Sequence, residues 1–136
     1  MIALTKESLF IATEQDVILC RNRTRELAVK VGMSLLNQTK LLTAASELVR
    51  NLLKYGGGGT VILEIVSDQK NTGLRLTFQD EGPGIADIKL AMQDGYSTGK
   101  SLGLGLPGAK RLVNEFNIQS ELGKGTTVVI TRWKNG

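Results

Sequence analysis

The sequence predicts a single α/β (α+β) domain over residues 1–136, and three observations support this class. The chain has 136 residues, of which 41% are hydrophobic, enough for one compact core. Two stretches among the first 55 residues repeat apolar side chains at helical spacing. Two later pairs of β-prone stretches are each joined by a short turn that contains glycine, which is typical of β-hairpins.

Composition excludes several classes of function. The chain carries 17 basic and 13 acidic residues with only 4% aromatics, so nucleic-acid binding has little support. It contains no histidine, which removes Ser-His-Asp hydrolysis, Cys-His nucleophiles, histidine zinc sites and phosphorylation of its own histidine. Any chemistry must therefore use carboxylates, amides, lysines, hydroxyls and the backbone.

Hydropathy predicts a soluble, cytoplasmic protein with no membrane association. The longest apolar runs, such as Val61 to Val66, are too short to span a bilayer, and the N-terminus lacks the pattern of a signal peptide. The single cysteine, Cys20, lies in a helix-like stretch, where we expect a small buried residue instead of a reactive thiol.

The first elements are an edge strand and an amphipathic helix. Leu9-Phe10-Ile11 indicates a modest strand at a sheet edge. Thr13 to Asp16 resembles a capping box, and Gly32 ends the helix that follows. Its apolar positions are Val17, Cys20, Thr24, Leu27 and Val31. The three arginines of this helix are a solvated face or a docking surface for an acidic partner: Arg21, Arg23 and Arg25.

A second helix is expected from an N-cap at Asn37 to about Tyr55, with Gly56 to Gly59 ending it. Its apolar stripe consists of Leu41, Ala45, Leu48, Leu52 and Tyr55. Beside this stripe, three polar side chains fall within roughly 60° of one another: Glu47, Asn51 and Lys54. They form either part of a site or an ordinary surface with an intrahelical ion pair.

The remaining elements are two hairpins and two helices. Strands at Val61 to Val66 and Leu74 to Asp80 form the first hairpin, through a turn at Lys70 to Gly73. A short helix is expected over Ile85 to Gln93, and Pro107 suits the first turn of another, whose core side chains would be Leu112, Val113 and Phe116. The second hairpin joins Ile118 to Leu122 with Thr126 to Trp133.

Asp80 stands at the end of an apolar strand. It shares the period-two face of Leu74, Leu76 and Phe78, which we expect to be buried. A carboxylate there is costly without hydrogen-bond donors, so Asp80 is either a turn cap or an anchor for a ligand. The exocyclic amino group of adenine is such a donor, whereas the carbonyl of guanine would be repelled.

The glycines after residue 94 match two phosphate-binding patterns only superficially. Gly99-Lys100-Ser101 looks like the end of a P-loop, but three residues instead of four separate Gly95 from Gly99. The literal G-x-G-x-x-G from Gly103 to Gly108 lacks a preceding strand. Glycines that lead into a helix can still bind phosphate through backbone N–H groups, so the residues favour a nucleotide site.

Three boxes in this order resemble the ATP-binding superfamily of gyrase B, Hsp90, histidine kinases and MutL. They are an N-box at Glu47 to Tyr55, an Asp-x-Gly-x-Gly box at Asp80 to Gly84, and a lid with a second glycine box at Gly99 to Gly108. The resemblance implies the Bergerat fold. This is a two-layer sandwich with a mixed, mostly antiparallel sheet, helices on one face, and an ATP lid from Gly95 to Gly105 that is flexible without nucleotide.

Within this superfamily the chain is most similar to the small anti-sigma-type serine/threonine protein kinases, especially the switch kinases of bacterial stress-signalling modules. Three segments carry the similarity: Asp80 to Ile85, Asp94 to Thr98 and Leu102 to Leu112. It implies Mg-ATP-dependent phosphorylation of a STAS-domain antagonist protein and activation of a PP2C-type phosphatase. The alternative is an anti-sigma factor that sequesters a sigma factor, although the Gly-Met-Gly-Phe-like box of that branch is absent.

The resemblance also implies roles for individual residues. Glu47 would orient or deprotonate the attacking hydroxyl, and Asn51 would bind Mg²⁺, which prefers oxygen ligands. Asp80 would hold adenine, helped by the Gly84 backbone and by Thr126 through water. The phosphates would contact Lys54, Lys100, Gly103 and Gly105. The other expected nucleotide contacts are Gly82, Ile85, Ser97, Thr98, Leu104 and Leu106.

Overall fold

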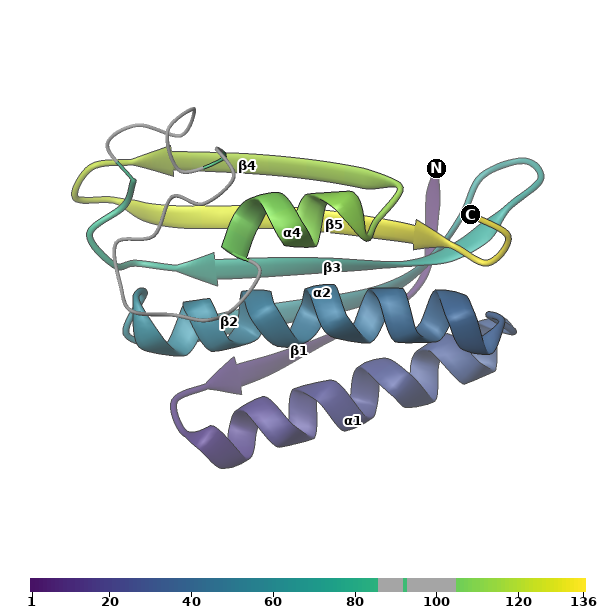
Figure 1. Cartoon of the computed structure of the whole chain (residues 1–136), viewed down its shortest axis with the longest axis horizontal. Helices are drawn as coiled ribbons and strands as arrows, with labels where there is room; N and C mark the ends of the chain where they lie inside the picture. The colour runs from purple at the N-terminus through teal and green to yellow at the C-terminus, as the bar shows by residue number, and fades with distance from the viewer. Residues whose placement is uncertain (86–91, 93–104) are drawn as a thin grey trace.

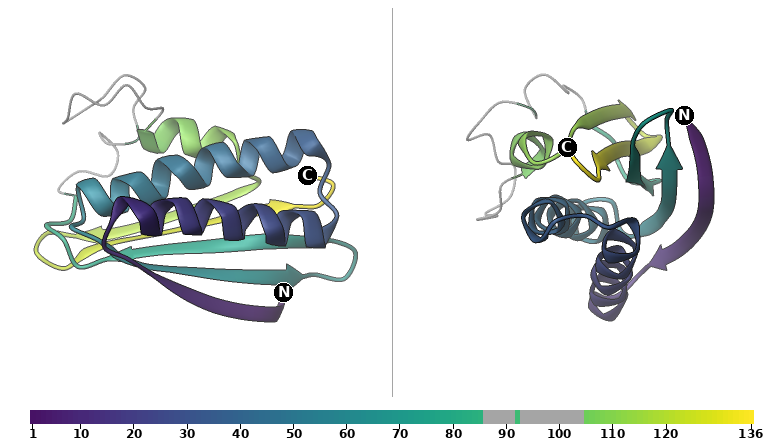
Figure 2. Two further views of the ribbon diagram at one scale, coloured as in Figure 1. Left: turned by 90° about the horizontal axis from the view of Figure 1, so that it is seen from below. Right: turned by 90° about the vertical axis from the view of Figure 1, so that its right-hand side faces the viewer.

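A computed structural model describes residues 1–85, 92 and 105–136. Its elements are β1 (Ile2–Ile11), α1 (Glu14–Val31), α2 (Leu35–Lys54), β2 (Gly59–Ser67), β3 (Thr72–Asp80), α4 (Gly105–Arg111), β4 (Glu115–Glu121) and β5 (Gly125–Trp133). The five strands form one sheet in the order β1-β2-β3-β5-β4, and the helices cover one face of it (Figures 1 and 2). The predicted two-layer α+β sandwich is confirmed.

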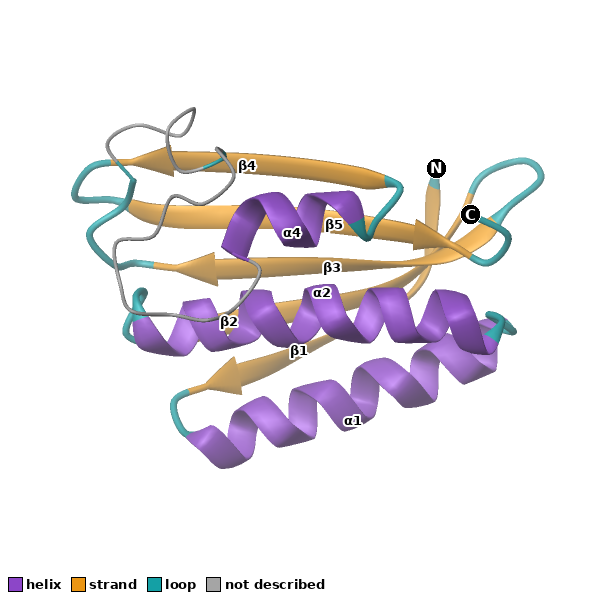
Figure 3. Cartoon of the chain, viewed as in Figure 1, coloured by secondary structure: helices purple, strands orange, loops and turns teal. Residues whose placement is uncertain are grey.

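The sheet is more regular than expected. All four strand pairings are antiparallel over the described strands, so the expectation of a mixed sheet is wrong in that detail (Figure 3). Tight hairpins join β2 to β3 and β4 to β5, and such turns reverse the chain direction. β1 lies at a sheet edge, as predicted, and is longer than the predicted segment.

One hydrophobic core lies between the helices and the sheet. Leu74, Leu76 and Phe78 of β3 face it, as the period of two predicted. From α2 it receives Leu41, Ala45, Leu48 and Leu52, which were predicted for the apolar stripe. Tyr55 was predicted for the same stripe, wrongly, because it is the C-cap of α2 and its side chain is 40% exposed.

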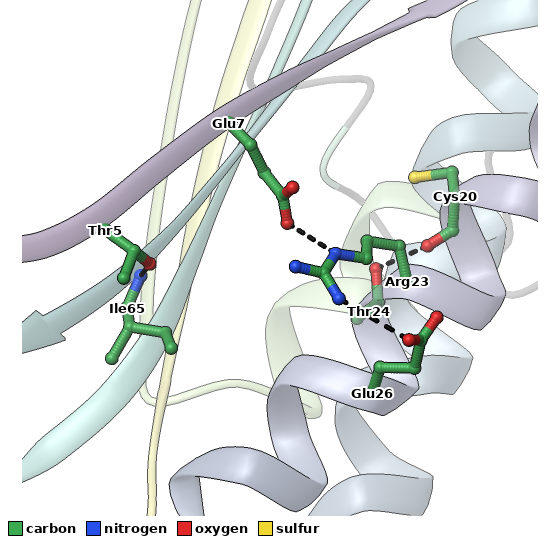
Figure 4. A network of polar contacts seen from close by, with 7 residues as sticks. All are labelled: Thr5, Glu7, Cys20, Arg23, Thr24, Glu26 and Ile65. Atoms are coloured by element: carbon green, nitrogen blue, oxygen red, sulfur yellow. Dashed lines mark hydrogen bonds and ion pairs between the residues drawn. The ribbon is translucent and has the colours of Figure 1, made fainter.

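The start of α1 and its attachment to β1 follow from local sequence. Thr13 and Asp16 form the predicted capping box, and Gly32 ends the helix in the left-handed region, with φ of 90°. Figure 4 shows Arg23 reaching β1, where its Nε donates to Glu7 Oε1 at 2.6 Å. Cys20 is fully buried, as expected, and burial raises the pKa of its thiol to about 11.

The predicted N-cap of α2 is wrong. The helix begins at Leu35, because the hydroxyl of Ser34 accepts the N–H of Asn37 at 3.1 Å. The Asn37 side chain is instead bound by the C-terminal segment. Its Nδ2 donates to the carbonyl of Lys134 at 3.0 Å, and its Oδ1 accepts from Arg132 at 2.7 Å. Tertiary partners therefore decide between two residues that both suit a helix cap.

The segment after α4 also differs from expectation. The helix contains Pro107 but ends at Arg111, and Phe116 belongs to β4, which begins at Glu115 instead of Ile118. Leu112, Val113 and Phe116 still pack against the core. The backbone N–H of Asn114 donates to the carbonyl of Thr131 at 2.9 Å, so pairing with β5 replaces further helix. The predicted helix at 85–93 and the lid lie outside the described residues, except for Ile85, Met92 and Gly105.

No helix within the described ranges combines the length and apolar character needed to cross a membrane.

Candidate active site

Asp80 ends a row of three polar side chains that crosses the sheet. In the strand register Asp80 of β3 pairs with Thr126 of β5, which in turn pairs with Ser120 of β4. This row lies on the helix-covered face, because each of the three continues the inward alternation of its strand. Asp80 is half-buried at the end of its strand, not fully buried as expected.

One oxygen of the Asp80 carboxylate is already engaged. Oδ1 accepts the backbone N–H of Gly82 at 2.8 Å and that of Thr126 at 3.3 Å. Within the described part of the chain, no hydrogen bond involves Oδ2. The two donors fix the carboxylate, and the second oxygen remains available as an acceptor. Both expected roles of Asp80 are therefore compatible, since it caps a turn with one oxygen and keeps the other.

The glycine run after α2 brings the end of this helix against Asp80. A Cβ built on Gly56 would lie 2.6 Å from Asp80 Cγ and 2.7 Å from Oδ2, closer than any side chain tolerates. A Cβ on Gly82 would lie 2.9 Å from Gly56 Cα. The sequence suggested only a helix stop at Gly56, because the contact with Asp80 depends on the tertiary fold.

The polar edge of α2 holds the candidate catalytic group. Glu47 is only 7% exposed, and its Oε1 accepts the backbone N–H of Gly105 at 3.0 Å. Asn51 lies one turn later and is half-buried. Its side-chain amide forms no hydrogen bond with any described residue. Lys54 is exposed, and its ammonium lies 5.1 Å from the centroid of the Tyr55 ring. No ion pair links these side chains to one another, so the alternative of an ordinary intrahelical pair does not hold among them.

The turn after Asp80 rests on the β4–β5 hairpin. Gly84 has φ of +78°, and a Cβ there would lie 2.2 Å from the carbonyl oxygen of Glu121. The next N–H, that of Ile85, donates to Ser120 Oγ at 2.7 Å. Ser120 was missed by sequence reasoning. The available signal was a hydroxyl on the inward face of β4, where Phe116 and Ile118 precede it at a spacing of two.

The predicted site residues gather in two groups. Asp80, Gly82, Gly84, Ile85 and Thr126 surround the end of β3, whereas Glu47, Asn51 and Gly105 lie along α2 and the start of α4. Leu106 is half-buried and packs against the core. The other expected contacts lie outside the described residues: Ser97, Thr98, Lys100, Gly103 and Leu104.

The two groups are held apart by one helix. From Glu47 to Lys54, the last residue of α2, the helical rise amounts to roughly 10 Å, and Gly56 follows two residues later.

A hollow at the end of β3 includes Asp80 and the glycine run after α2 but not Glu47. It is lined by Phe10, Gly56, Gly57, Gly58, Gly59, Thr60, Gln79, Asp80, Glu81, Lys124 and Thr127. Phe10, Thr60, Gln79 and Thr127 are successive cross-strand neighbours that alternate with inward-facing residues. The hollow therefore shares Asp80 and the glycine run with the candidate site and extends over the face of the sheet opposite the helices.

The chain matches the model of one protein family over most of its length. The model described as histidine kinase-, DNA gyrase B-, and HSP90-like ATPase matches residues 36–135, which contain both groups of candidate residues. The chain belongs to this ATPase family. The membership confirms the family resemblance found in the sequence, and it implies that the domain binds ATP.

Two related proteins narrow the kind of ATPase domain to which this chain is similar. Serine/threonine-protein kinase RsbT of Bacillus subtilis (strain 168) is 42% identical over 123 residues, covering 90% of this chain and 92% of RsbT. An anti-sigma F factor of Geobacillus sp. (strain WCH70) is 29% identical over 131 residues, covering 91% of this chain and 88% of that protein. The ATPase domain is thus a homologue of an RsbT-type serine/threonine kinase and is related to anti-sigma F factors.

Solved structures support the same fold. The RsbU and RsbW domains of Rv1364c from Mycobacterium tuberculosis match with a TM-score of 0.66 at 21% identity, over 94% of this chain and 32% of that longer chain. The mycobacterial sensor histidine kinase MprB matches with a TM-score of 0.57 at 18% identity, over 95% of this chain and 97% of the other. At these identities the likeness concerns the fold of the ATPase domain alone.

Proposed function

We propose that this chain acts as one domain, a Mg²⁺- and ATP-dependent serine/threonine protein kinase of the cytoplasm. Its substrate would be a STAS-domain antagonist protein in a partner-switching stress pathway. The main support is that one helix connects a buried carboxylate, Glu47, with the second carboxylate site at Asp80. The homology to RsbT supports the choice of a serine or threonine acceptor.

The base-binding end of the site fits adenine. Asp80 Oδ2 is an acceptor, and the exocyclic amino group of adenine is a donor, whereas guanine would present a carbonyl to the same oxygen. At Gly56 and Gly82 the backbone approaches the carboxylate more closely than any residue with a Cβ would allow. In this proposal the backbone around Gly84 and Ile85 and the Thr126 hydroxyl complete the contacts with the base.

The residues present also fit Mg²⁺. Its preferred ligands are oxygens, and it commonly keeps several waters and phosphate oxygens. The amide oxygen of Asn51 would supply one protein ligand. The described residues contain no group of three or more histidine, cysteine, aspartate or glutamate side chains arranged to hold a metal, so the remaining ligands would be phosphates and water. A bound Mg²⁺ would neutralise charge on the phosphates during transfer.

Glu47 is the proposed catalytic residue. Its Oε1 is held by Gly105, which leaves Oε2 to orient the hydroxyl of the protein substrate. As the bond between this hydroxyl oxygen and the γ-phosphorus forms, the bond from the γ-phosphorus to the bridging oxygen breaks, ADP leaves, and the hydroxyl proton passes to Glu47. Lys54 would have to leave the Tyr55 ring to reach a phosphate. We propose the remaining phosphate and nucleotide contacts at Ser97, Thr98, Lys100, Gly103 and Leu104.

A phosphotransfer assay tests this function. The protein is incubated with Mg²⁺, γ-labelled ATP and a purified STAS-domain partner, and the acceptor is identified by mass spectrometry. We expect phosphoserine or phosphothreonine on the partner. If neither phosphotransfer nor ATP hydrolysis occurs in the presence of bound nucleotide, the assignment as a kinase is wrong.

The similarity to anti-sigma F factors supports a second candidate, an anti-sigma factor that binds a sigma factor in a nucleotide-dependent manner. A third interaction, activation of a PP2C-type phosphatase, is compatible with the kinase. Pull-down from cell extract with and without ATP separates these partners. Recovery of a sigma factor favours the anti-sigma function, and recovery of a STAS protein and a phosphatase favours the switch kinase.

A further inference from the structure

Ser120 of β4 has three polar contacts that tie the Asp80 turn to the β4–β5 hairpin. Its Oγ lies 2.7 Å from the N–H nitrogen of Ile85, 3.0 Å from the carbonyl oxygen of Gly125 and 2.8 Å from Thr126 Oγ1. Thr126 pairs directly with Asp80 in the strand register, and Ser120 pairs with Thr126 from the other side, so Ser120 lies two strands from the carboxylate proposed to bind the base.

The direction of each hydrogen bond follows from counting protons. The Gly125 carbonyl can only accept, so the single hydroxyl proton of Ser120 is donated to it. The Ile85 N–H can only donate, so it uses a lone pair of Ser120 Oγ. The contact between the two hydroxyls is then a hydrogen bond only if Thr126 supplies the proton. Thr126 therefore donates to Ser120 and keeps only lone pairs for other partners.

This orientation gives the end of the site two acceptors next to each other. Asp80 Oδ2 is an acceptor without a donor among the described residues, and the oriented Thr126 Oγ1 is a second. Two adjacent acceptors favour a base edge that carries an amino group, which can donate to them directly or through one water. They disfavour a base edge that carries a carbonyl. A Thr126 hydroxyl free to rotate could donate to that carbonyl.

We propose that Ser120 is a positioning residue for base selectivity: it holds the Thr126 hydroxyl as an acceptor, so that the site prefers adenine to a 6-oxopurine. This inference rests on the proposed nucleotide site. Ser120 does not touch the base in this account. It acts through Thr126, and through Ile85 it also fixes the end of the Asp80 turn.

The test compares ATP with inosine triphosphate (ITP), in which a carbonyl replaces the amino group of adenine. Dissociation constants for both nucleotides are measured by isothermal titration calorimetry in the presence of Mg²⁺. In Ser120→Ala we expect the preference for ATP over ITP to narrow about three- to ten-fold, the value of one neutral hydrogen bond. Ser120→Thr keeps the hydroxyl and should retain the wild-type ratio. Ser8→Ala, on the exposed edge strand, serves as the matched control.

The ratio of ATP to ITP affinity is also measured in Thr126→Val, a variant that leaves Ser120 bonded to Ile85 and Gly125. It should narrow the ratio as well, and adding Ser120→Ala to it should change the ratio no further. The inference is overturned if Ser120→Ala or Thr126→Val keeps the wild-type ratio, or if both nucleotides weaken equally, as a purely structural role would produce. A wild-type protein that fails to bind ATP would overturn the proposed function itself.

Discussion

Replacing Gly56 by alanine tests whether the end of α2 must contact the Asp80 carboxylate. The added Cβ would lie 2.6 Å from Asp80 Cβ and Cγ and 2.7 Å from Oδ2, below any normal contact. Either the helix end or the carboxylate must move, at a cost of about 1–3 kcal/mol for overpacking. Because movement of the carboxylate also weakens its bonds to Gly82 and Thr126, we expect ATP affinity to fall roughly 10- to 100-fold.

Gly57→Ala is the matched control for this variant. Gly57 has φ of +74° with nothing within 4 Å of its built Cβ, so alanine there meets backbone strain of about 1–2 kcal/mol but no contact with Asp80. Titration calorimetry and thermal unfolding are measured on both variants. We expect Gly57→Ala to lose stability yet keep ATP affinity. Equal ATP affinity in Gly56→Ala and wild type would refute the close approach of Gly56 to Asp80 as a requirement of the site.

Two further predictions concern stability and reactivity. Asn37→Ala should lower the free energy of unfolding by about 1–3 kcal/mol in urea titrations, because the buried Arg132 guanidinium loses an acceptor; an unchanged midpoint would contradict this role. The Cys20 thiol has its pKa raised by burial from 9.0 to about 11, so it should resist iodoacetamide at neutral pH in the folded protein and react after unfolding. Since the folded state keeps the thiol proton longer, stability should fall as pH rises from about 9 to 11, and Cys20→Ala should remove that component.

Periodic patterns predicted most of the elements because they report which face a helix or strand buries. The alternation through Leu74, Leu76 and Phe78 placed Asp80 on the helix-covered face, and the capping box at Thr13 located the start of α1. The pattern of α2 likewise brought Glu47 and Asn51 to one edge. These features depend only on the spacing of residues within one segment, and that spacing can be counted directly from the sequence.

Features that depend on distant contacts were predicted less well. Ser34 and Asn37 are both good helix caps, and the choice depends on Arg132, which lies at the far end of the chain. Phe116 fits a helical stripe as well as a strand, until pairing with β5 decides between them. Ser120 joins the site only because β4 lies beside β5, an arrangement that its own segment does not reveal.

The separation of roles between Asp80 and Glu47 is tested most directly by measuring ATP affinity and phosphotransfer on matched isosteric variants. Glu47→Gln keeps an oxygen that can accept from Gly105, so it should bind ATP nearly as wild type does while phosphotransfer falls at least about 100-fold. Asp80→Asn places an amide donor where Oδ2 stands, so it should weaken ATP binding and favour ITP relative to wild type. Equal loss of ATP binding in both variants would contradict the account.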